Sequence, residues 1–235
     1  MKVIIVGGVA GGATAAARIR RLDEHAEITV YERSGYISYA NCGLPYYIGD
    51  VITDPEELTL QTPESFFKRF HINMKIHHEV ISIYPDHKTV SVKNLENGEI
   101  FEENYDKLIL SPGAKPTQPR LSGVGIDKLF TLRTVEDTFR IKKYINKNHP
   151  KSVVLAGGGF IGLELAENLR ELGMDVTIVQ RPKQLMNPFD PDMASMIHNE
   201  MRKHGIKLVL GYTVEGFREK DNGVEILLKD NPSLQ

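Results

Sequence analysis

With 235 residues, of which 41% are hydrophobic, the chain is long enough to form one large or two small packed domains. Its 29 Lys and Arg nearly balance its 31 Asp and Glu, and the formal net charge of -2 gives no field that would attract nucleic acid or a membrane surface. We therefore expect small-molecule partners, no nucleic acid and no membrane. The first apolar run, residues 3–6, is too short for a secretion signal or a membrane span, so a cytoplasmic protein is expected.

A strand is predicted at residues 2–6, and a glycine-rich turn at residues 7–12 leads from it into an Ala-rich helix predicted at residues 13–22. This order is typical of a dinucleotide-binding unit, in which backbone N–H groups at the start of the helix face a pyrophosphate. The middle glycine of the G-x-G-x-x-G pattern is replaced by Val9, which weakens the match. The turn residues that we expect at the nucleotide are Gly7, Gly8, Ala10, Gly11 and Gly12.

A second strand, predicted at residues 27–32, ends in Glu32, whose carboxylate is suited to accept hydrogen bonds from ribose hydroxyls. Arg33 would then lie against the adenine. The alternative is a βαβ unit that has a glycine turn and binds no ligand. The acid at the end of the strand weighs against that alternative.

The same theme recurs in the second half of the chain. A strand is predicted at residues 152–156, and a helix predicted at residues 161–172 is closed by Gly173. The turn between them matches G-x-G-x-x-G in full, and its candidate contacts are Gly157, Gly159, Phe160, Ile161 and Gly162. One such motif is weak evidence, but two in one chain, each between a strand and a helix, indicate two dinucleotide sites.

The next strand of this second unit, predicted at residues 175–180, ends without an acid and has Gln180 and Arg181 in its place. An acid there would hold the free 2′-hydroxyl of NADH and repel a 2′-phosphate. Arg181, together with Lys183, therefore favours NADPH, although either nicotinamide cofactor remains open.

Between the two units, short segments with β character are separated by turn signals. We expect an antiparallel insertion at residues 73–84, 88–94 and 99–103, and then an apolar strand at residues 105–110. The histidines show no metal-ligand spacing, and no metal site is predicted. His77 and His78 are expected next to each other on a strand, where their side chains would point to opposite faces.

The elements predict an α/β fold with two Rossmann-like dinucleotide-binding domains and an antiparallel β insertion. The Pro-rich stretch 112–119 is the expected boundary. The domains would therefore span residues 1–117 and 118–235.

Cys42 is the only cysteine, which excludes an internal disulfide and the paired-cysteine redox motifs. It follows the first unit, where a flavin ring would lie if that unit held the adenylate end of FAD. Asn41 is expected to cap a short helix that begins at Cys42, with Pro45 in its first turn. A thiol at a helix N-terminus is favoured as the reactive thiolate, and the alternative is a buried small hydrophobe.

Four motifs together resemble the single-cysteine flavoprotein disulfide reductases, above all the coenzyme A disulfide reductases and their persulfide-reducing relatives. The motifs are residues 7–12, 38–46, 111–114 and 157–164, and the resemblance covers the whole chain. It implies FAD in the first domain, NADPH or NADH in the second, and reduction of coenzyme A disulfide or a related persulfide or polysulfide.

The resemblance also implies roles for single residues. Cys42 is the redox nucleophile that forms a mixed disulfide with coenzyme A, and Ser38 and Asn41 support the substrate thiol. Glu32 holds the FAD ribose, and Glu164 lies by the nicotinamide. Further cofactor contacts are expected from Val80, Ser111, Gly113 and Arg133.

Arg18 and Arg21 are three residues apart and share one face of the first helix. A solvated basic face is one interpretation. Since the family uses this helix to grip the phosphates of coenzyme A, Thr14, Arg18 and Arg21 are expected at the substrate. Arg20 points elsewhere and is expected to be ordinary surface.

The chain also departs from the related peroxidases and oxidases, which commonly carry a histidine in the first glycine turn and a serine before the cysteine. Ala10 and Asn41 occupy these positions, which favours the disulfide or persulfide branch. An NAD(P)H oxidase with a cysteine sulfenate and a non-catalytic dinucleotide-binding module remain alternatives.

Family members continue beyond the position that corresponds to Gln235, and the last strand predicted here lies at residues 224–229. We therefore expect an N-terminal portion that is inactive by itself and belongs to a homodimeric full-length protein.

Overall fold

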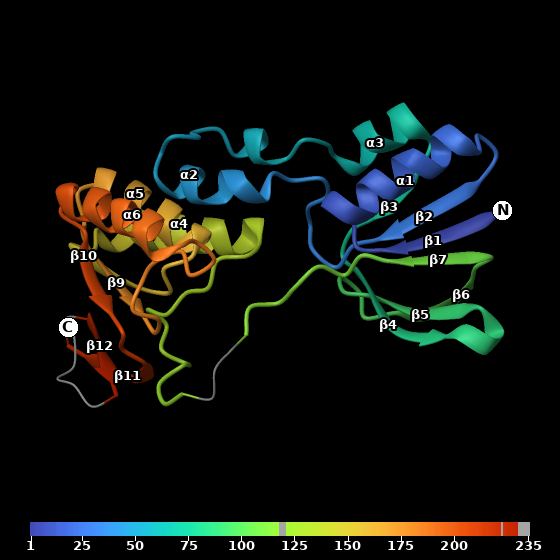
Figure 1. Cartoon of the computed structure of the whole chain (residues 1–235). Coiled ribbons are helices and arrows are strands. Elements are labelled where there is room, and N and C mark those ends of the chain that lie inside the picture. Colours follow the sequence, from blue (N-terminus) through green and yellow to red (C-terminus); the bar gives the residue numbers. More distant parts are fainter. Residues whose placement is uncertain (118–120, 222, 230–235) are drawn as a thin grey trace. The chain divides into compact units, whose positions relative to one another are not determined.

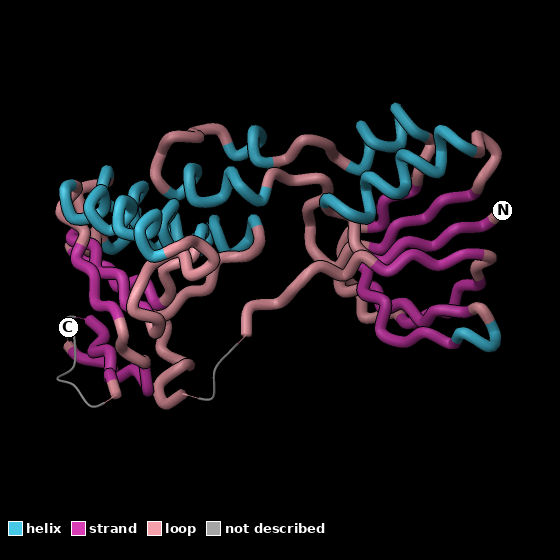
Figure 2. The backbone as a smooth tube through the Cα atoms, in the orientation of Figure 1, coloured by secondary structure: helices cyan, strands magenta, loops and turns pink. Residues whose placement is uncertain are grey.

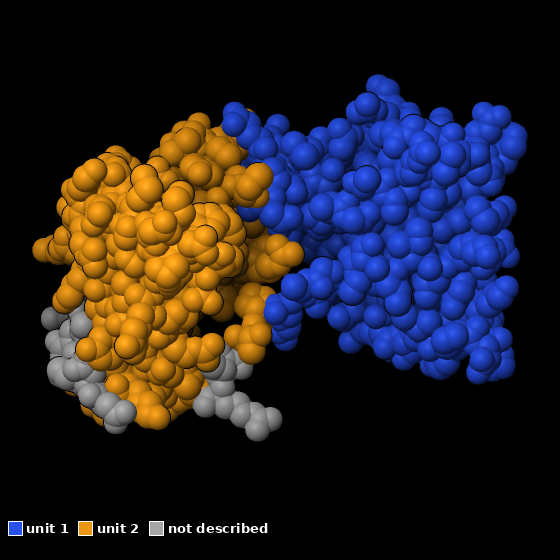
Figure 3. Space-filling view, in the orientation of Figure 1, with its two compact units in different colours: residues 1–41, 55–115 blue, residues 42–54, 116–235 orange. Residues whose placement is uncertain are grey.

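The computed structural model describes residues 1–117, 121–221 and 223–229. The chain forms two compact units (Figure 3): a first unit of residues 1–41 and 55–115, and a second unit of residues 42–54 and 116–235. The division at residues 115 and 116 falls within the Pro-rich stretch. The structure differs from the expected domains in residues 42–54, which group with the second unit because they pack on its helices.

The first unit is built on a parallel sheet of β1 (Lys2–Val6), β2 (Glu27–Tyr31), β3 (Asn73–Lys75) and β7 (Lys107–Leu110), in the order β3-β2-β1-β7. Helices α1 (Ala10–Leu22) and α3 (Pro63–Phe70) lie along one face of this sheet (Figure 1). The expected strand, turn and helix at the N-terminus are confirmed.

An antiparallel sheet of β4 (His78–Tyr84), β5 (Thr89–Asn94) and β6 (Ile100–Asn104) forms the predicted insertion (Figure 2). The short 3-10 helix η3 (Pro85–His87) joins its first two strands. The segment 73–84 is not one strand, because His77 has a left-handed backbone with φ 55° and separates β3 from β4. The expectation that His77 lies on a strand is therefore wrong.

Alternating side chains of the first parallel sheet fill two separate cores. Val3 and Ile5 pack with residues of α1 and α3, whereas Ile4 packs with Val90 and Val92 of the antiparallel sheet. Because both faces of the sheet are covered, its strands are apolar throughout rather than alternating.

The second unit repeats this plan with a parallel sheet of β8 (Ser152–Ala156), β9 (Asp175–Gln180) and β10 (Lys207–Leu210), in the order β10-β9-β8. Its helices are α2 (Leu44–Ile48), α4 (Val135–Asn148), α5 (Phe160–Glu171) and α6 (Pro191–Lys203). The other face carries an antiparallel pair, β11 (Val214–Lys220) and β12 (Gly223–Leu228), and β12 is the strand expected at residues 224–229.

The second sheet is also covered on both faces. Val176 and Ile178 of β9 belong to a core shared with the helices, and Val179 packs against Ile226 and Leu228 of β12. Gly173, at φ 86°, ends α5 as expected and turns the chain into β9.

Two structural absences hold for the residues that the structure describes. No helix among them is long and apolar enough to cross a membrane. Within the same residues, no group of three or more His, Cys, Asp or Glu side chains is placed to hold a metal ion.

Candidate functional site

The first glycine turn joins β1 to α1 in a conformation that needs glycine at two positions. Gly7 has φ 96°, and a Cβ added to it would collide with the carbonyl oxygen of Ser111. A Cβ at Gly12 would collide with the carbonyl oxygen of Gly7. Val9, which replaces the middle glycine, has a negative φ of -94° and so does not adopt the left-handed conformation that favours glycine.

The second turn repeats two features of the first, a positive φ at its first glycine and a close approach at its last. Gly157 has φ 131°, and a Cβ at Gly162 would collide with the carbonyl oxygen of Gly157. A Cβ at Gly159 would meet no atom within 4 Å, so the space in front of this turn is open. Close backbone approach by a ligand is therefore sterically possible here.

Both helices that follow the turns begin without a side-chain cap. The N-cap residues are Val9 for α1 and Gly159 for α5, and neither makes a side-chain hydrogen bond to the helix. The first N–H groups of a helix have no partner within the helix and favour an anion. Both turns therefore fit the pyrophosphate of a dinucleotide.

A hydrogen bond from each turn reaches the side chain at the end of the neighbouring strand. The Gly8 N–H donates to Glu32 Oε2 at 2.8 Å, and the Gly158 N–H donates to Gln180 Oε1 at 3.0 Å. The Ser34 N–H donates to the second oxygen of Glu32 at 2.8 Å. Because a carboxylate offers about four acceptor positions, Glu32 retains capacity for ribose hydroxyls.

The remaining first-unit candidates are Ser111, Gly113 and Val80. Ser111 follows β7, and its N–H donates to the Val6 carbonyl oxygen at 2.8 Å, which holds it beside Gly7. Gly113 has the positive φ, 70°, that lets the chain turn after this point. Val80 contributes to the core with Ile4.

Arg33, the residue expected against the adenine, is exposed and pairs weakly with Glu79 at 4.0 Å. Such an exposed pair contributes little to stability, so the guanidinium is available to a ligand at small cost.

The cysteine lies in a different local structure from the one expected. Asn41–Gly43 forms the 3-10 turn η1, and α2 begins at Leu44 with Gly43 as its N-cap, so the expected helix start at Cys42 is wrong. Pro45 does lie in the first turn of α2. Cys42 is exposed, which excludes the alternative of a buried small hydrophobe.

Ser38 is held beside the first glycine turn by its backbone. Its N–H donates to the Gly8 carbonyl oxygen at 3.0 Å, and its φ of 48° is a left-handed conformation that is uncommon for serine. Ser38 and Asn41 belong to the first unit, whereas Cys42 belongs to the second.

The three arginines near the end of α1 have different environments. Arg18 and Arg21 are exposed and make no hydrogen bond or ion pair within the described ranges. Arg20 donates to the carbonyl oxygens of Phe70 and His71 at 2.8 and 2.9 Å, so the expectation of ordinary surface is wrong. The described Thr14 is also exposed and lies four residues before Arg18, on the same helix face.

The end of β9 presents two cations. Arg181 and Lys183 are exposed, and neither forms an ion pair with another residue in the described part of the chain. Within the described residues, no carboxylate would therefore compete with an anionic ligand for these two side chains.

Four further second-unit candidates lie on α5 or before α4. Phe160 and Ile161 are 64% and 48% exposed in the first turn of α5. Glu164, one turn further, is half-buried, and its carbonyl oxygen accepts a hydrogen bond from the Asn168 side chain at 2.7 Å. Arg133 is half-buried before α4, and its backbone N–H donates to Asp137 at 3.1 Å.

His198 of α6 holds the loop that follows β9, and the sequence pattern did not identify it. The Leu185 N–H donates to His198 Nε2 at 2.9 Å, so the ring must be neutral at this nitrogen. Burial, with a smaller effect of Arg202, lowers the pKa of His198 below its usual 6.5. No sequence signal pairs a helix residue with this loop, because the contact depends on tertiary packing.

Known proteins resemble this chain over its whole length. Residues 1–235 match the family described as "Pyridine nucleotide-disulphide oxidoreductase". The coenzyme A disulfide reductase of Staphylococcus aureus (strain MRSA252) is 42% identical over 228 residues, which are 97% of this chain and 50% of that protein. The chain thus spans about half the length of the curated relatives that it matches.

Two solved structures share the fold. The reduced CoADR-RHD of Bacillus anthracis is 47% identical with a TM-score of 0.95, covering 100% of this chain and 42% of that one. The water-forming NADH oxidase of Lactobacillus brevis, bound to NADH, is 34% identical with a TM-score of 0.92, covering 100% of this chain and 52% of that one.

The His198 contact predicts a pH-dependent stability. Since the pKa is lower in the folded state than in the unfolded state, the unfolded chain binds more protons, and stability falls as the pH decreases below about 6.5. Thermal unfolding measured between about pH 7.5 and about pH 5 should show this decline. His198→Gln retains an acceptor and should flatten it, whereas the exposed His149→Gln should not. Equal slopes for His198→Gln and the parent would contradict the assignment.

Proposed function

The chain belongs to the pyridine nucleotide-disulphide oxidoreductase family, and we propose that its protein is an FAD-dependent, NAD(P)H-consuming reductase of coenzyme A disulfide or a related persulfide. The observation that carries this proposal is an exposed, solitary Cys42 in a chain with two glycine turns, each followed by a helix that has no side-chain N-cap. Because the chain spans about half of its curated relatives, the activity proposed is that of the whole protein.

Members of this family use FAD and NAD(P)H. We assign FAD to the first unit, where the turn beginning at Gly7 would face the pyrophosphate and Glu32 the ribose. NAD(P)H is assigned to the second unit, where the turn beginning at Gly157 and the side chains after β9 serve the same purposes. Bound FAD would supply the transfer of two electrons from the nicotinamide to a disulfide.

Cys42 would act as the nucleophile. Its thiolate attacks one sulfur of coenzyme A disulfide, the S–S bond breaks, and the product is a mixed disulfide plus one coenzyme A thiolate. Two electrons from NAD(P)H then cleave the mixed disulfide and restore the Cys42 thiolate with release of the second thiolate. A chain with a single cysteine has no resolving thiol of its own, so the mixed disulfide must be reduced directly.

Phosphate groups distinguish coenzyme A disulfide from small disulfides. Arg18 and Arg21 would bind these groups, and Thr14 would add a hydroxyl on the same face of α1. Their exposure and their lack of ion pairs within the described residues support this assignment. Ser38 and Asn41 are proposed to support the substrate sulfur.

A second candidate function is an NAD(P)H oxidase in which Cys42 cycles through a sulfenate. The similarity to the water-forming NADH oxidase of Lactobacillus brevis favours it. Ala10 and Asn41 favour the reductase, because they occupy the positions where the related oxidases commonly carry a histidine and a serine. Oxygen consumption without added disulfide at the rate of NAD(P)H use would establish the oxidase instead.

Replacement of the thiol should separate the two halves of the reaction. In the full-length protein, Cys42→Ser should lower coenzyme A disulfide turnover by about a thousand-fold or more, because electrons leave through this sulfur. NADPH-dependent reduction of ferricyanide, which needs no thiol, should stay at the parental rate and serves as the control. Undiminished disulfide turnover in the variant would remove Cys42 from the mechanism.

The cation after β9 should set the choice of nicotinamide. One charge-assisted contact to the 2′-phosphate contributes about 1.5 to 3 kcal/mol, so NADPH should be preferred by roughly 10- to 100-fold. Arg181→Ala should erase the preference by raising the KM for NADPH alone. Lys147→Ala removes an exposed cation elsewhere and should change neither KM. A strong preference for NADH in the parent protein would reject the assignment.

Charge reversal at Arg18 and Arg21 should weaken the binding only of a substrate that carries phosphate groups. Arg18→Glu with Arg21→Glu should raise the KM for coenzyme A disulfide about tenfold or more and leave that for a small uncharged disulfide within about twofold. Lys68→Glu, on the exposed surface of α3, is the matched control. Equal changes in the KM for both substrates would show that the two arginines do not bind substrate phosphates.

A further inference from the structure

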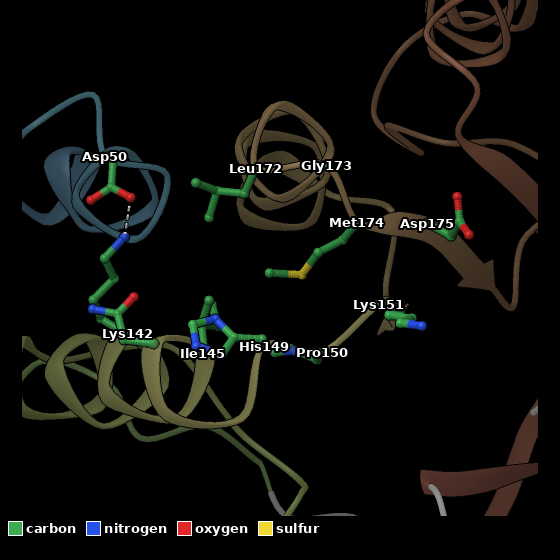
Figure 4. A pocket seen from close by; sticks show the side chains of 11 residues that line it. Asp50, Lys142, Ile145, His149, Pro150, Lys151, Leu172, Gly173, Met174 and Asp175 are labelled. Carbon is green, nitrogen blue, oxygen red and sulfur yellow. Dashed lines mark ion pairs between the residues drawn. The ribbon is translucent and has the colours of Figure 1, made fainter.

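Lys142 is a buried lysine whose ammonium group lies at the last turn of α2, the helix that directly follows the 3-10 turn of Cys42. It projects from α4 with 9% of its surface exposed. Its Nζ donates to the carbonyl oxygen of Ile48 at 2.8 Å and pairs with the Asp50 carboxylate at 2.6 Å (Figure 4). The last carbonyl groups of a helix have no partner within it, so this lysine caps α2 from a neighbouring helix.

Apolar contacts also hold α2 against α4 and α5. Ile48 is fully buried in the core that contains Ala166 and Leu169 of α5. The backbone at Gly49 lies so close to α5 that an added Cβ would collide with the Asn168 side chain. The rings of Tyr47 and Phe139 meet edge to face with centroids 5.5 Å apart. The second unit thus holds α2 on two sides.

These apolar contacts alone do not explain a lysine at position 142. Lysine is rarely buried unless it is paired, and its desolvation offsets most of the attraction that a buried ion pair supplies. An apolar residue would fill the space at lower cost. What the ammonium group adds is direction, since it bonds to one particular carbonyl and one carboxylate. Asp50 meets it from a left-handed conformation with φ 62°.

We propose that Lys142 is a positioning residue for Cys42: by fixing the end of α2 it holds the thiol, which lies in the 3-10 turn directly before α2, at a defined place on the second unit. The inference rests on the proposed function of Cys42. The two elements are short, Asn41–Gly43 and Leu44–Ile48, and adjoin without a gap. A constraint on one end therefore limits motion at the other.

The surroundings of Lys142 make the proposal testable without unfolding the protein. The ion pair lines a cavity of about 510 Å³ at the end of β8 and β9 that is opposite to the glycine turn (Figure 4). The Asp50 side chain is 56% exposed. Lys142→Met should therefore leave a carboxylate that water can solvate and a filled core.

The experiment compares Lys142→Met with Lys142→Arg, which restores a cation, and with Lys143→Met, which removes the exposed neighbouring cation, in the full-length protein. Lys142→Met should lower kcat for coenzyme A disulfide by about 10- to 100-fold through misplacement of the thiol. The KM for NADPH and ferricyanide reduction should stay parental. Lys142→Arg should recover most of the loss, and Lys143→Met should show none.

Two readouts do not depend on turnover. The alkylation rate of Cys42 by iodoacetamide and amide exchange in residues 42–54, both followed by mass spectrometry, should change several-fold in Lys142→Met. Parental kcat, alkylation and exchange in that variant would overturn the proposal. If Cys42→Ser retained disulfide turnover, the proposed function would fail, and alkylation and exchange would still decide the positioning role.

Should Lys142→Met fail to fold, Asp50→Asn decides the question. It removes the charge that orients the ammonium group and keeps the bond to Ile48. Faster exchange in residues 42–54 would support the positioning role, and parental exchange and alkylation rates would overturn it.

Discussion

In each unit, a hydrogen bond between a backbone N–H and a side chain helps to hold the glycine turn, the candidate nucleotide site, against the sheet. It runs from the second residue of the glycine turn to the side chain at the end of the neighbouring strand, from Gly8 to Glu32 and from Gly158 to Gln180. The turns have almost no side chains of their own with which to pack. The bond therefore fixes the turn to the sheet together with the Gly7 and Gly157 N–H groups, which donate to the carbonyl oxygens of Tyr31 and Val179 at 2.8 and 2.9 Å. These contacts set the direction of the N–H groups that begin α1 and α5.

The two bonds share geometry and differ in charge. Glu32 brings an anion that takes two backbone N–H groups, whereas Gln180 is a neutral amide. An anion in the second turn would repel a phosphate placed near the ribose, and the amide would not. The same fold element can thus serve two nucleotides that differ in their phosphates while the backbone stays the same.

Periodicity and glycine spacing predicted both turns and most of the parallel strands, because these depend on local sequence. Strand β10 was not predicted, and β3, which was expected in the antiparallel insertion, pairs in parallel with β2. Strands β1, β8 and β9 lie at the expected residues. The predictions that failed depend on contacts between distant residues. Arg20 bonds to carbonyl groups about fifty positions away along the chain, and no pattern in the sequence of α1 predicts this. His77 adopts a left-handed turn where strand residues flank it on both sides.

The site was predictable to a similar extent. The exposed Cys42 and the two turns lie in recognisable motifs, but the helix start was misplaced because Asn41 and Gly43 can both precede a helix. The loop contact of His198 and the buried Lys142 have no local signal. Each depends on a helix packing against a segment that the sequence places far away.

The inclusion of residues 42–54 in the second unit has a consequence for dissecting the protein. The chain passes between the units three times, after residues 41, 54 and 115, so neither unit is a contiguous piece of sequence. A fragment starting at residue 116 would lack α2 and leave the apolar site of Ile48 open on its surface. A single proteolytic cut near residue 116 would likewise leave the units joined through the other two crossings. An isolated second unit that keeps its native packing must therefore include α2 packed against α4 and α5.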